Sequence, residues 1–371
     1  MTMALVLASL LTAAPGAWMA GVARTDITPQ EPMWLSGYAA RDHAAEGAIH
    51  PLWVKALALR DADGRDAVIV TCDILGFPRQ MASNIHTRLK KSLGLEPAQI
   101  MLNASHSHST PVLVGPLMPM YPLDDASKEK VREYSARLED RIVETVEAAC
   151  AARQPAQISS TNGVVRFAVN RRNNNEREIL ETYDIEGPVD HAVPVLRVAG
   201  EDGSTLAVLF GYACHCTVLS DYKWCGDYPG FAMIALEEKY PGATAMFFAG
   251  CGGDINPLPR RSLALAEQYG AELAAAVERA LKESPKALDP SLRMQYRETE
   301  LALEDPPSRE ALEEIAETAP GYKARCAQEM VDQLDAGQPL RTTYPYPVQV
   351  WQLGSQTIVA LGGEVVVDYA I

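Results

Sequence analysis

The chain has 371 residues, of which 47% are hydrophobic and 22% are charged, so it has ample material for one large globular domain or two. Its formal net charge is −15, and no run of Lys or Arg is long enough to follow a phosphate backbone. The charge therefore argues against nucleic acid as a partner.

The N-terminus contains an apolar stretch from Ala4 to Ala14, followed by small residues. This pattern is typical of a secretory signal with a cleavage site between Ala14 and Ala20, although no basic residue precedes it. We predict that residues 1–20 are a signal peptide or its remnant, that the protein is secreted or periplasmic, and that the domain occupies residues 21–371. A buried first strand is the alternative. No later segment is long and apolar enough to span a bilayer.

The first third of the chain predicts strands that lead to polar residues. Apolar runs at Trp53–Arg60 and Ala67–Thr71 flank the turn sequence Asp-Ala-Asp-Gly-Arg-Asp and predict a β-hairpin, which continues to Asp73. A further apolar strand, Ile100–Ser105, is followed directly by His106.

The middle of the chain repeats this scheme. Apolar residues spaced by three and four over Val131–Val146 predict a helix. The runs Val193–Val198 and Leu206–Tyr212 lie on either side of Gly-Glu-Asp-Gly-Ser and predict a second hairpin, which leads to His215. A turn then leads into a predicted helix at Phe231–Glu238.

The last third predicts two more helices and a hairpin. Helical spacing resumes over Leu263–Leu281, and a more charged segment, Ser308–Leu334, predicts a surface helix. A third hairpin is predicted from Val348–Leu353 and Thr357–Leu361 around Gly-Ser-Gln, and it leads to Glu364.

Hairpins interspersed with helices favour an α/β fold with mixed β-sheets and helices packed on the outside, in a single large catalytic domain. A purely parallel, doubly wound sheet is disfavoured. Four predicted strands run into residues capable of chemistry, namely Asp73, His106, His215 and Glu364. Because a rigid sheet holds its strand ends in place, α/β enzymes commonly build their sites there.

The sequence Asn103-Ala-Ser-His-Ser-His-Ser-Thr-Pro carries the sharpest local signal. In extended backbone, His106 and His108 project from the same face and can converge on one point. Neutral imidazole is a preferred zinc ligand, and a catalytic zinc keeps one position open for water. With His215, the pair predicts a metal-dependent hydrolase with a zinc site, whereas the pair alone also fits surface or hydrogen-bonded histidines.

Two further segments follow His215 in the sequence. Asp227 lies near the start of a predicted helix, where it would cap the helix or hold a ligand in place. The strand from Ala245 runs into the glycine-rich turn Gly250-Cys-Gly-Gly-Asp-Ile-Asn. A phosphate cradle would need Lys-Ser/Thr and a helix N-terminus, where Pro257 stands instead. We therefore interpret its glycines as allowing either a close approach of the backbone to a ligand or unusual backbone dihedrals.

The seven cysteines give an odd count, which leaves at least one thiol unpaired. Four of them lie near the candidate site in the sequence, with spacings that do not fit a zinc finger or ribbon: Cys214, Cys216, Cys225 and Cys251. We interpret the cysteines as small buried hydrophobic residues, with room for one disulfide.

In combination and order, these motifs resemble the neutral/alkaline non-lysosomal ceramidases, zinc amidases that cleave the N-acyl bond of ceramide. The resemblance runs from about Ala20 to Glu364 and concerns the N-terminal catalytic domain of that family. Its elements in chain order are Ala23-Arg-Thr-Asp-Ile-Thr-Pro, Ser36-Gly-Tyr-Ala, Ile49-His, the strand ending in Asp73, the H-x-H-Ser segment, Asn170-Arg171, the His215 segment, Gly226-Asp and Gly253-Asp-Ile-Asn-Pro.

The resemblance implies that His106, His215 and Glu364 are zinc ligands, and that His108 and Arg171 bind and polarise the substrate carbonyl. It implies a zinc-dependent amidohydrolase that uses metal-activated water on the N-acyl amide bond of ceramide or a related N-acyl lipid. Small amides are alternative substrates. A transient contact with a membrane surface would follow from a lipid substrate.

The chain departs from the family pattern at two places. The family's Gly-Asp-x-Ser-Pro motif contains a serine that has been considered catalytic, and Asn256 stands at that position here. A covalent serine mechanism is therefore disfavoured, whereas attack by metal-activated water needs no protein nucleophile. The family also continues to a tyrosine ligand and a further small domain, whereas this sequence ends at Ile371, which we interpret as a fragment or a natural truncation.

Two other functions stay open from the sequence. A metal-dependent esterase or phosphatase would add Asp73 and Asp227 to the histidines in a two-metal cluster. A binding protein would retain zinc without hydrolysis. The remaining histidines are expected to be hydrogen-bonded or surface residues and not ligands: His43, His50, His86 and His191.

Overall fold

A nine-stranded mixed β-sheet forms the middle layer of the protein. The computed structural model describes residues 17–182, 184–283 and 285–371. The strand order is β11-β9-β8-β6-β1-β3-β4-β5, and β13 pairs with β6. The strands are β1 (Trp18–Asp26), β3 (Trp53–Arg60), β4 (Asp66–Cys72), β5 (Ile100–Ala104), β6 (Gln154–Val164), β8 (Ala192–Gly200), β9 (Thr205–Tyr212), β11 (Thr244–Ala249) and β13 (Lys286–Ala287).

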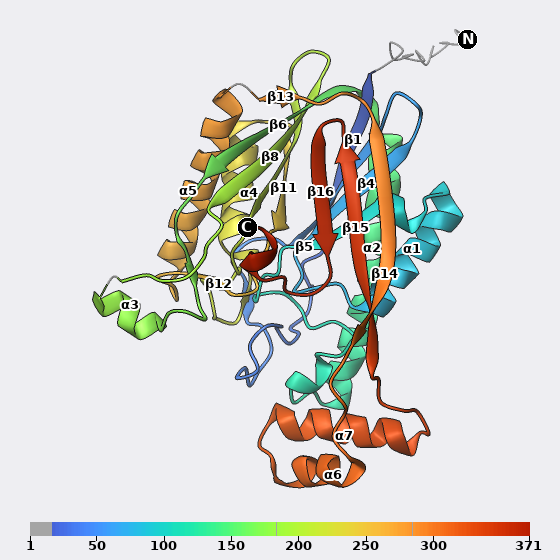
Figure 1. The fold of residues 1–371 in the computed structure, drawn as a ribbon, viewed down its shortest axis with the longest axis vertical. Helices are drawn as coiled ribbons and strands as arrows, with labels where there is room; N and C mark the ends of the chain where they lie inside the picture. The colour runs from blue at the N-terminus through green and yellow to red at the C-terminus, as the bar shows by residue number, and fades with distance from the viewer. Residues whose placement is uncertain (1–16, 183, 284) are drawn as a thin grey trace, which may run out of the picture.

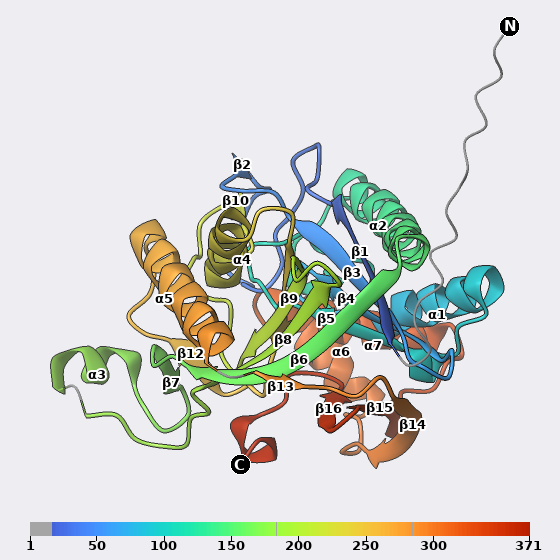
Figure 2. The same ribbon diagram turned by 90° about the horizontal axis from the view of Figure 1, so that it is seen from above.

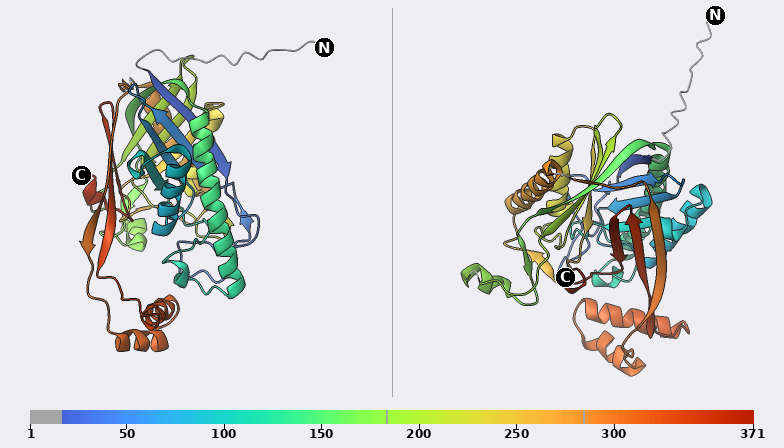
Figure 3. Two further views of the ribbon diagram at one scale, coloured as in Figure 1. Left: turned by 90° about the vertical axis from the view of Figure 1, so that its right-hand side faces the viewer. Right: turned by 45° about the horizontal axis from the view of Figure 1, so that its top comes forward.

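Helices cover one face of this sheet and a second, smaller sheet covers the other (Figure 2). The helices are α1 (Arg79–Leu93), α2 (Asp125–Ala151), α4 (Asp227–Lys239) and α5 (Leu263–Lys282). The smaller sheet is antiparallel, with the order β14 (Leu292–Ala302), β15 (Thr343–Leu353) and β16 (Gln356–Leu361). Figure 3 shows the three layers edge-on in its left view.

The alternation of side chains along the strands explains this layering. In β3, Val54 and Ala56 belong to the core under α1 and α2, whereas Leu57 and Leu59 face the smaller sheet and share a core with Trp351. Successive side chains of a strand point to opposite faces, so a strand that is apolar at every position is buried on both. Each large side chain buried in this way contributes about 1.5–3 kcal/mol to stability.

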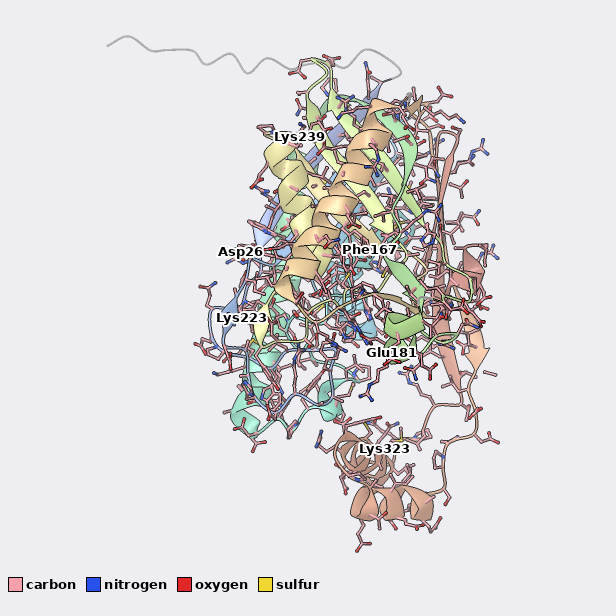
Figure 4. The ribbon with its side chains drawn as sticks, turned by 90° about the vertical axis from the view of Figure 1, so that its left-hand side faces the viewer. Asp26, Phe167, Glu181, Lys223, Lys239 and Lys323 are labelled. Carbon is pink, nitrogen blue, oxygen red and sulfur yellow. The ribbon has the colours of Figure 1, made fainter. Side chains whose placement is uncertain are left out.

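The helices begin where capping residues satisfy free backbone N–H groups. The side chain of Asp124 accepts a hydrogen bond from the backbone N–H of Ser127 at the start of α2, and Ser262 does the same for Leu265 at the start of α5. Phe167 lies between the sheet and α5 (Figure 4), where its ring stacks on Tyr269 at 4.4 Å.

Parallel strand pairs lie at the two edges of the large sheet, where they position the candidate site. β4 pairs with β5 and β9 pairs with β11 in parallel, whereas the other neighbours are antiparallel. The accumulated twist brings the two edges together, and the backbone N–H of Ala249 donates to Asn103 Oδ1 at 3.3 Å. The carboxyl ends of β5 and β11 therefore meet, and that of β9 lies beside β11.

The structure confirms the predicted mixed α/β class and the three hairpins, which are β3–β4, β8–β9 and β15–β16. The predicted helices 131–146, 231–238 and 263–281 lie within α2, α4 and α5. The remaining short elements are β2 (Gly47–Ala48), β7 (Ala168–Asn170), β10 (Lys223–Trp224), β12 (Ile255–Pro257), α3 (Glu176–Thr182) and the 3₁₀ turns η1 (Pro97–Gln99), η2 (Met118–Met120) and η3 (Val367–Tyr369).

The prediction of one surface helix over Ser308–Leu334 is wrong. Two helices occupy this segment, α6 (Arg309–Thr318) and α7 (Tyr322–Asp335). Pro320 and Gly321 separate them, because proline cannot donate to a continuing helix and Gly321 adopts a φ of 65°. The two helices form a projection between β14 and β15 at the lower end of Figure 1, and Lys323 marks α7 in Figure 4.

The start of the described chain bears on the predicted signal segment. Residues 1–16, the greater part of that segment, lie outside the described residues. β1 begins at Trp18, whose buried indole donates a hydrogen bond to the carbonyl of Leu288. Among the described residues, no helix has the length and hydropathy needed to cross a bilayer.

Candidate metal centre

The two histidine-bearing segments follow β5 and β9 and pair with each other. Ser107 and Cys216 form an isolated parallel β-bridge, and the backbone N–H of His108 donates to the carbonyl of Cys216 at 3.3 Å. This long-range pairing places His106 and His108 beside His215, although more than a hundred residues separate them in the sequence.

The backbone of the H-x-H segment is not extended, contrary to the sequence-based expectation. β5 ends at Ala104, and His106 adopts a φ of 60°, in the left-handed region that non-glycine residues rarely occupy. Such a conformation costs about 1–3 kcal/mol and is found mainly where the surrounding structure enforces it. The rings still converge, because the Nε2 atoms of His106 and His108 lie 3.3 Å apart.

Three imidazoles form a group that could hold a metal ion. His106, His108 and His215 each offer one ring nitrogen, and these nitrogens lie within 4.8 Å of one another. Their ring centroids are 4.9–5.8 Å apart. Burial lowers the pKa of His106 and, more strongly, that of His108, so both rings favour the neutral form that binds metals.

The three rings differ in the hydrogen bonding of their Nδ1 atoms. His106 Nδ1 lies 2.7 Å from the carbonyl oxygen of Leu75, and His215 Nδ1 lies 2.7 Å from that of Gly252. These carbonyls accept hydrogen bonds, so each Nδ1 carries the proton and each Nε2 presents a lone pair. The Nδ1 atom of His108 is buried without a hydrogen-bond partner. Two of the three histidines therefore have a fixed tautomer.

Glu364 reaches the same point from the smaller sheet. It follows β16, and its Oε2 lies 3.1 Å from His215 Nε2 while its Oε1 lies 3.6 Å from His106 Nε2. The close contact with His215 is the largest effect that lowers the pKa of Glu364, to about 2, and burial opposes it. The side chain is therefore a carboxylate near neutral pH.

The donor set fits a metal cation. If His215 carries its proton at Nδ1 alone, its Nε2 presents a lone pair, and the facing oxygen of Glu364 is also an acceptor. His106, which also donates through Nδ1, presents a lone pair at Nε2 that lies 3.6 Å from the other oxygen of Glu364. Only a proton or a cation between such atoms satisfies both, and the lowered pKa of His106 disfavours the proton between His106 and Glu364.

Arg171 lies next to Glu364, at the end of β7. Its backbone N–H donates to the carbonyl of Asp254, and its Nη2 donates to the carbonyl of Gly253 at 2.6 Å. The same Nη2 lies 3.6 Å from Glu364 Oε2. Arg171 therefore brings a positive charge to the edge of the group.

The glycine-rich turn after β11 clamps the segment that carries Glu364. A side chain at Gly253 would place its Cβ 2.4 Å from the backbone oxygen of Glu364, and the N–H of Gly253 donates to the carbonyl of Val365 at 2.8 Å. Asp254 accepts a hydrogen bond from the N–H of Val367 at 2.9 Å. The turn thus acts through close backbone approach.

Asn256, which stands where the resemblance would place a serine, is buried in β12 opposite Val169. Its Oδ1 accepts a long hydrogen bond of 3.5 Å from Thr217 Oγ1. The amide offers no nucleophile, so this position contributes packing and hydrogen bonding.

Asp73 and Asp227 do not join the three-histidine group. Asp73 Oδ2 accepts a hydrogen bond from the backbone N–H of Trp53 at 2.9 Å, which ties β3 to the end of β4. Asp227 accepts from the N–H groups of Val218 and Leu219 and so fixes the loop that follows His215. Their oxygens are engaged with backbone, which weakens the case for a two-metal cluster.

The other histidines and the cysteines lie outside the group. His50 Nε2 lies 3.2 Å from Cys225 Sγ, and the ring of His43 lies between two exposed carboxylates. His86 and His191 also lie outside it. All seven cysteines are free thiols, and five of them are buried, in agreement with the interpretation as small core residues.

A cavity of about 1420 Å³ opens onto the site. His106, His215 and Glu364 line it, whereas His108 and Arg171 are not among its lining residues. Apolar side chains come from the loops before α1 and α2, from β11 and from β16, among them Phe77, Val112, Leu113, Phe248 and Ile358. α1 contributes mainly polar side chains, among them Arg79, His86 and Lys90.

Comparison with known proteins decides the family. The model of the family described as neutral/alkaline non-lysosomal ceramidase, N-terminal, matches residues 18–257. The chain belongs to this family. The matched range includes His106, His108, Arg171 and His215, and Glu364 lies beyond it.

Two solved structures share the fold. The crystal structure of neutral ceramidase from Pseudomonas aeruginosa aligns with a TM-score of 0.72 at 20% identity, over 93% of this chain and 62% of that one. A ceramidase complexed with C2 aligns with a TM-score of 0.70 at 19% identity, over 93% and 63%. The chain thus spans about three fifths of each relative's length. A search of curated protein sequences gave no match.

Sequence reasoning assigned no role to the loop behind His108. A Cβ at Gly37, whose φ is 96°, would lie 2.4 Å from His108 Cγ, and the ring of Tyr38 lies 4.9 Å from that of His108 between centroids. Arg41 donates to the carbonyl of His108 at 2.6 Å. The only available signal was Ser36-Gly-Tyr-Ala, which contributed to the resemblance without indicating a contact.

Proposed function

We propose that the chain is a zinc-dependent amidohydrolase that uses water to cleave the N-acyl amide bond of ceramide or of a related N-acyl lipid. One observation carries the proposal: imidazoles and a carboxylate converge at a large, mainly apolar cavity. Membership of the ceramidase family supports the reaction class.

We assign the metal to His106, His215 and Glu364. Hydrogen bonds from Nδ1 to backbone carbonyls are the arrangement that fixes the tautomer and orientation of metal-binding histidines, and His106 and His215 have them. His108 lacks such a partner. A zinc ion held there would lower the pKa of a water molecule to about 7 and so provide a nucleophile at neutral pH.

We assign His108 and Arg171 to the acyl carbonyl. Arg171 is cationic and lies beside Glu364, so it would stabilise negative charge that develops on the carbonyl oxygen. His108 faces His106 with Nε2 and would donate to the same oxygen. Neither residue lines the cavity, but each lies beside a residue that does, His106 or Glu364, so the reacting carbonyl would have to lie next to these two.

The cavity supports a lipid substrate. Its volume of about 1420 Å³ exceeds the roughly 300–1,000 Å³ of pockets for drug-sized ligands. Burial of each methylene group contributes about 0.8 kcal/mol. The apolar walls should therefore favour long acyl chains over short ones.

The test compares hydrolysis of N-acyl-sphingosines and simple N-acyl amides that carry two-carbon or sixteen-carbon acyl groups. We expect hydrolysis to be faster for the long chains, to be lost with a chelator and to return with zinc. Matched acyl esters and phosphomonoesters serve as controls. A preference for either control class would favour an esterase or phosphatase, and zinc binding without any turnover would favour a binding protein.

A further inference from the structure

Arg41 is a buried cation whose hydrogen bonds all go to backbone carbonyls. Its Nη1 donates to the carbonyls of Ser36 at 2.5 Å and His108 at 2.6 Å, and its Nη2 donates to that of Asp221 at 3.0 Å. These carbonyls belong to three separate segments of the chain. One guanidinium therefore connects the segment that carries His108 to the segments that carry Ser36 and Asp221.

No carboxylate forms an ion pair with Arg41 among the described residues, although the negative charge of Asp221 favours the guanidinium from a greater distance. Arg41 Nε is buried without a hydrogen-bond partner among these residues. The guanidinium carbon lies 4.9 Å from the ring centroid of Tyr38 and 5.9 Å from that of Tyr222. A buried charge costs stability unless its contacts are well formed, so its retention points to a geometric role.

His108 needs such support more than the other two histidines. His106 and His215 are anchored through Nδ1 to carbonyls, whereas the Nδ1 of His108 has no partner. Its ring is located by packing against Gly37 and Tyr38 and by the position of its backbone. The carbonyl that Arg41 holds is part of that backbone.

We propose that Arg41 is a positioning residue for His108: by tying the carbonyl of His108 to those of Ser36 and Asp221, it fixes the backbone from which the imidazole reaches the acyl carbonyl. This inference rests on the proposed function for the role of His108 and goes beyond it for Arg41. Arg41 itself does not touch the reacting atoms.

The test uses the full chain with zinc and the variants Arg41→Met and Arg41→Lys. The control is Arg197→Met, since Arg197 donates to the carbonyl of Gly203 at the turn between β8 and β9. Three quantities are measured: kcat and KM for a long-chain N-acyl substrate, zinc per chain, and the ¹⁵N signals of the histidine rings, with His108 assigned through His108→Gln.

We expect Arg41→Met to lower kcat by about 10–100-fold, the effect of a misplaced catalytic group, with KM and zinc content close to wild type. The ring signals of His108 should shift while those of His106 and His215 stay. Arg41→Lys should lie in between, because an ammonium is a point donor without the planar fork of guanidinium. If Arg41→Met does not fold, the same measurements on Arg41→Lys provide the test.

Unchanged His108 signals in both Arg41 variants, or loss of zinc together with shifts at His106 and His215, would overturn the inference. Effects of the same size in Arg197→Met would also overturn it. An inactive wild-type protein would instead refute the proposed function, and the ring signals would then still decide whether Arg41 positions His108.

Discussion

The two sides of the candidate site are built differently. On the histidine side, the rings follow strands of the large sheet, and the side chains of His215 and His106 are only 2% and 18% exposed. On the carboxylate side, Glu364 follows the last strand of the smaller sheet and its side chain is 52% exposed. One side belongs to the rigid middle layer, and the other is a loop clamped by the turn at Gly253 and Asp254.

This difference indicates how the site is assembled. The parallel bridge between Ser107 and Cys216 and the carbonyl partners of the rings define the histidines without the smaller sheet. The position of Glu364 depends on hydrogen bonds between the turn and residues Val365 and Val367. We therefore expect metal binding to join two layers, with the carboxylate side as the adjustable partner.

The largest effect should come from removing the carboxylate charge. Glu364→Gln keeps the shape of the side chain but removes its anion, and we expect zinc affinity to fall by at least about 100-fold, more than the loss of an outer partner costs. His108→Gln is the matched variant and should keep zinc. Titration with a competing chelator measures both. If His108→Gln lost zinc and Glu364→Gln kept it, His108 and not Glu364 would be the third ligand.

A smaller loss of zinc affinity is expected when the turn at Gly253 and Asp254, which holds the segment of Glu364, is weakened. Asp254 accepts hydrogen bonds from Val367 N–H and from the amide of Asn170, and Asp254→Asn can satisfy only one of them well. Zinc affinity should fall about 10-fold, in the range of outer partners, with the histidine signals unchanged. Asp202→Asn, in the exposed turn between β8 and β9, is the control. Equal zinc affinity in both variants would show that the clamp does not position Glu364.

The sequence predicted the strands and the polar residues that follow them, because periodicity and turn residues are local signals. It placed His106, His215 and Glu364 after strands, and these three converge. It could not show the left-handed turn at His106 or the contact of Arg41 with His108, because both depend on pairing between distant segments. The split between α6 and α7 is marked in the sequence by Pro320, whereas the helical spacing on its own continues through it.

The remaining effect concerns stability instead of zinc affinity, namely the pH dependence of stability on the histidine side. Burial raises the pKa of Asp227 from 3.8 to about 6, so the folded state binds this proton more tightly than the unfolded state. Stability from this group is present at low pH and is lost as pH rises from about 4 to about 6, by at most about 3 kcal/mol.

Urea unfolding of the wild type and Asp227→Asn between pH 4 and pH 7 measures this loss. The free energy of unfolding of the wild type should fall relative to the variant over this interval. If the difference in the free energy of unfolding between the two proteins stayed constant over this interval, Asp227 would not titrate as described. A constant difference would reflect only its hydrogen bonds.

The most direct test of the central claim is zinc content measured together with N-acyl amide hydrolysis in the wild type and in His106→Ala. The account predicts about one tightly held zinc ion per wild-type chain and loss of both zinc and hydrolysis in the variant. If zinc stoichiometry and hydrolysis both survive the substitution, the proposed metal centre is wrong.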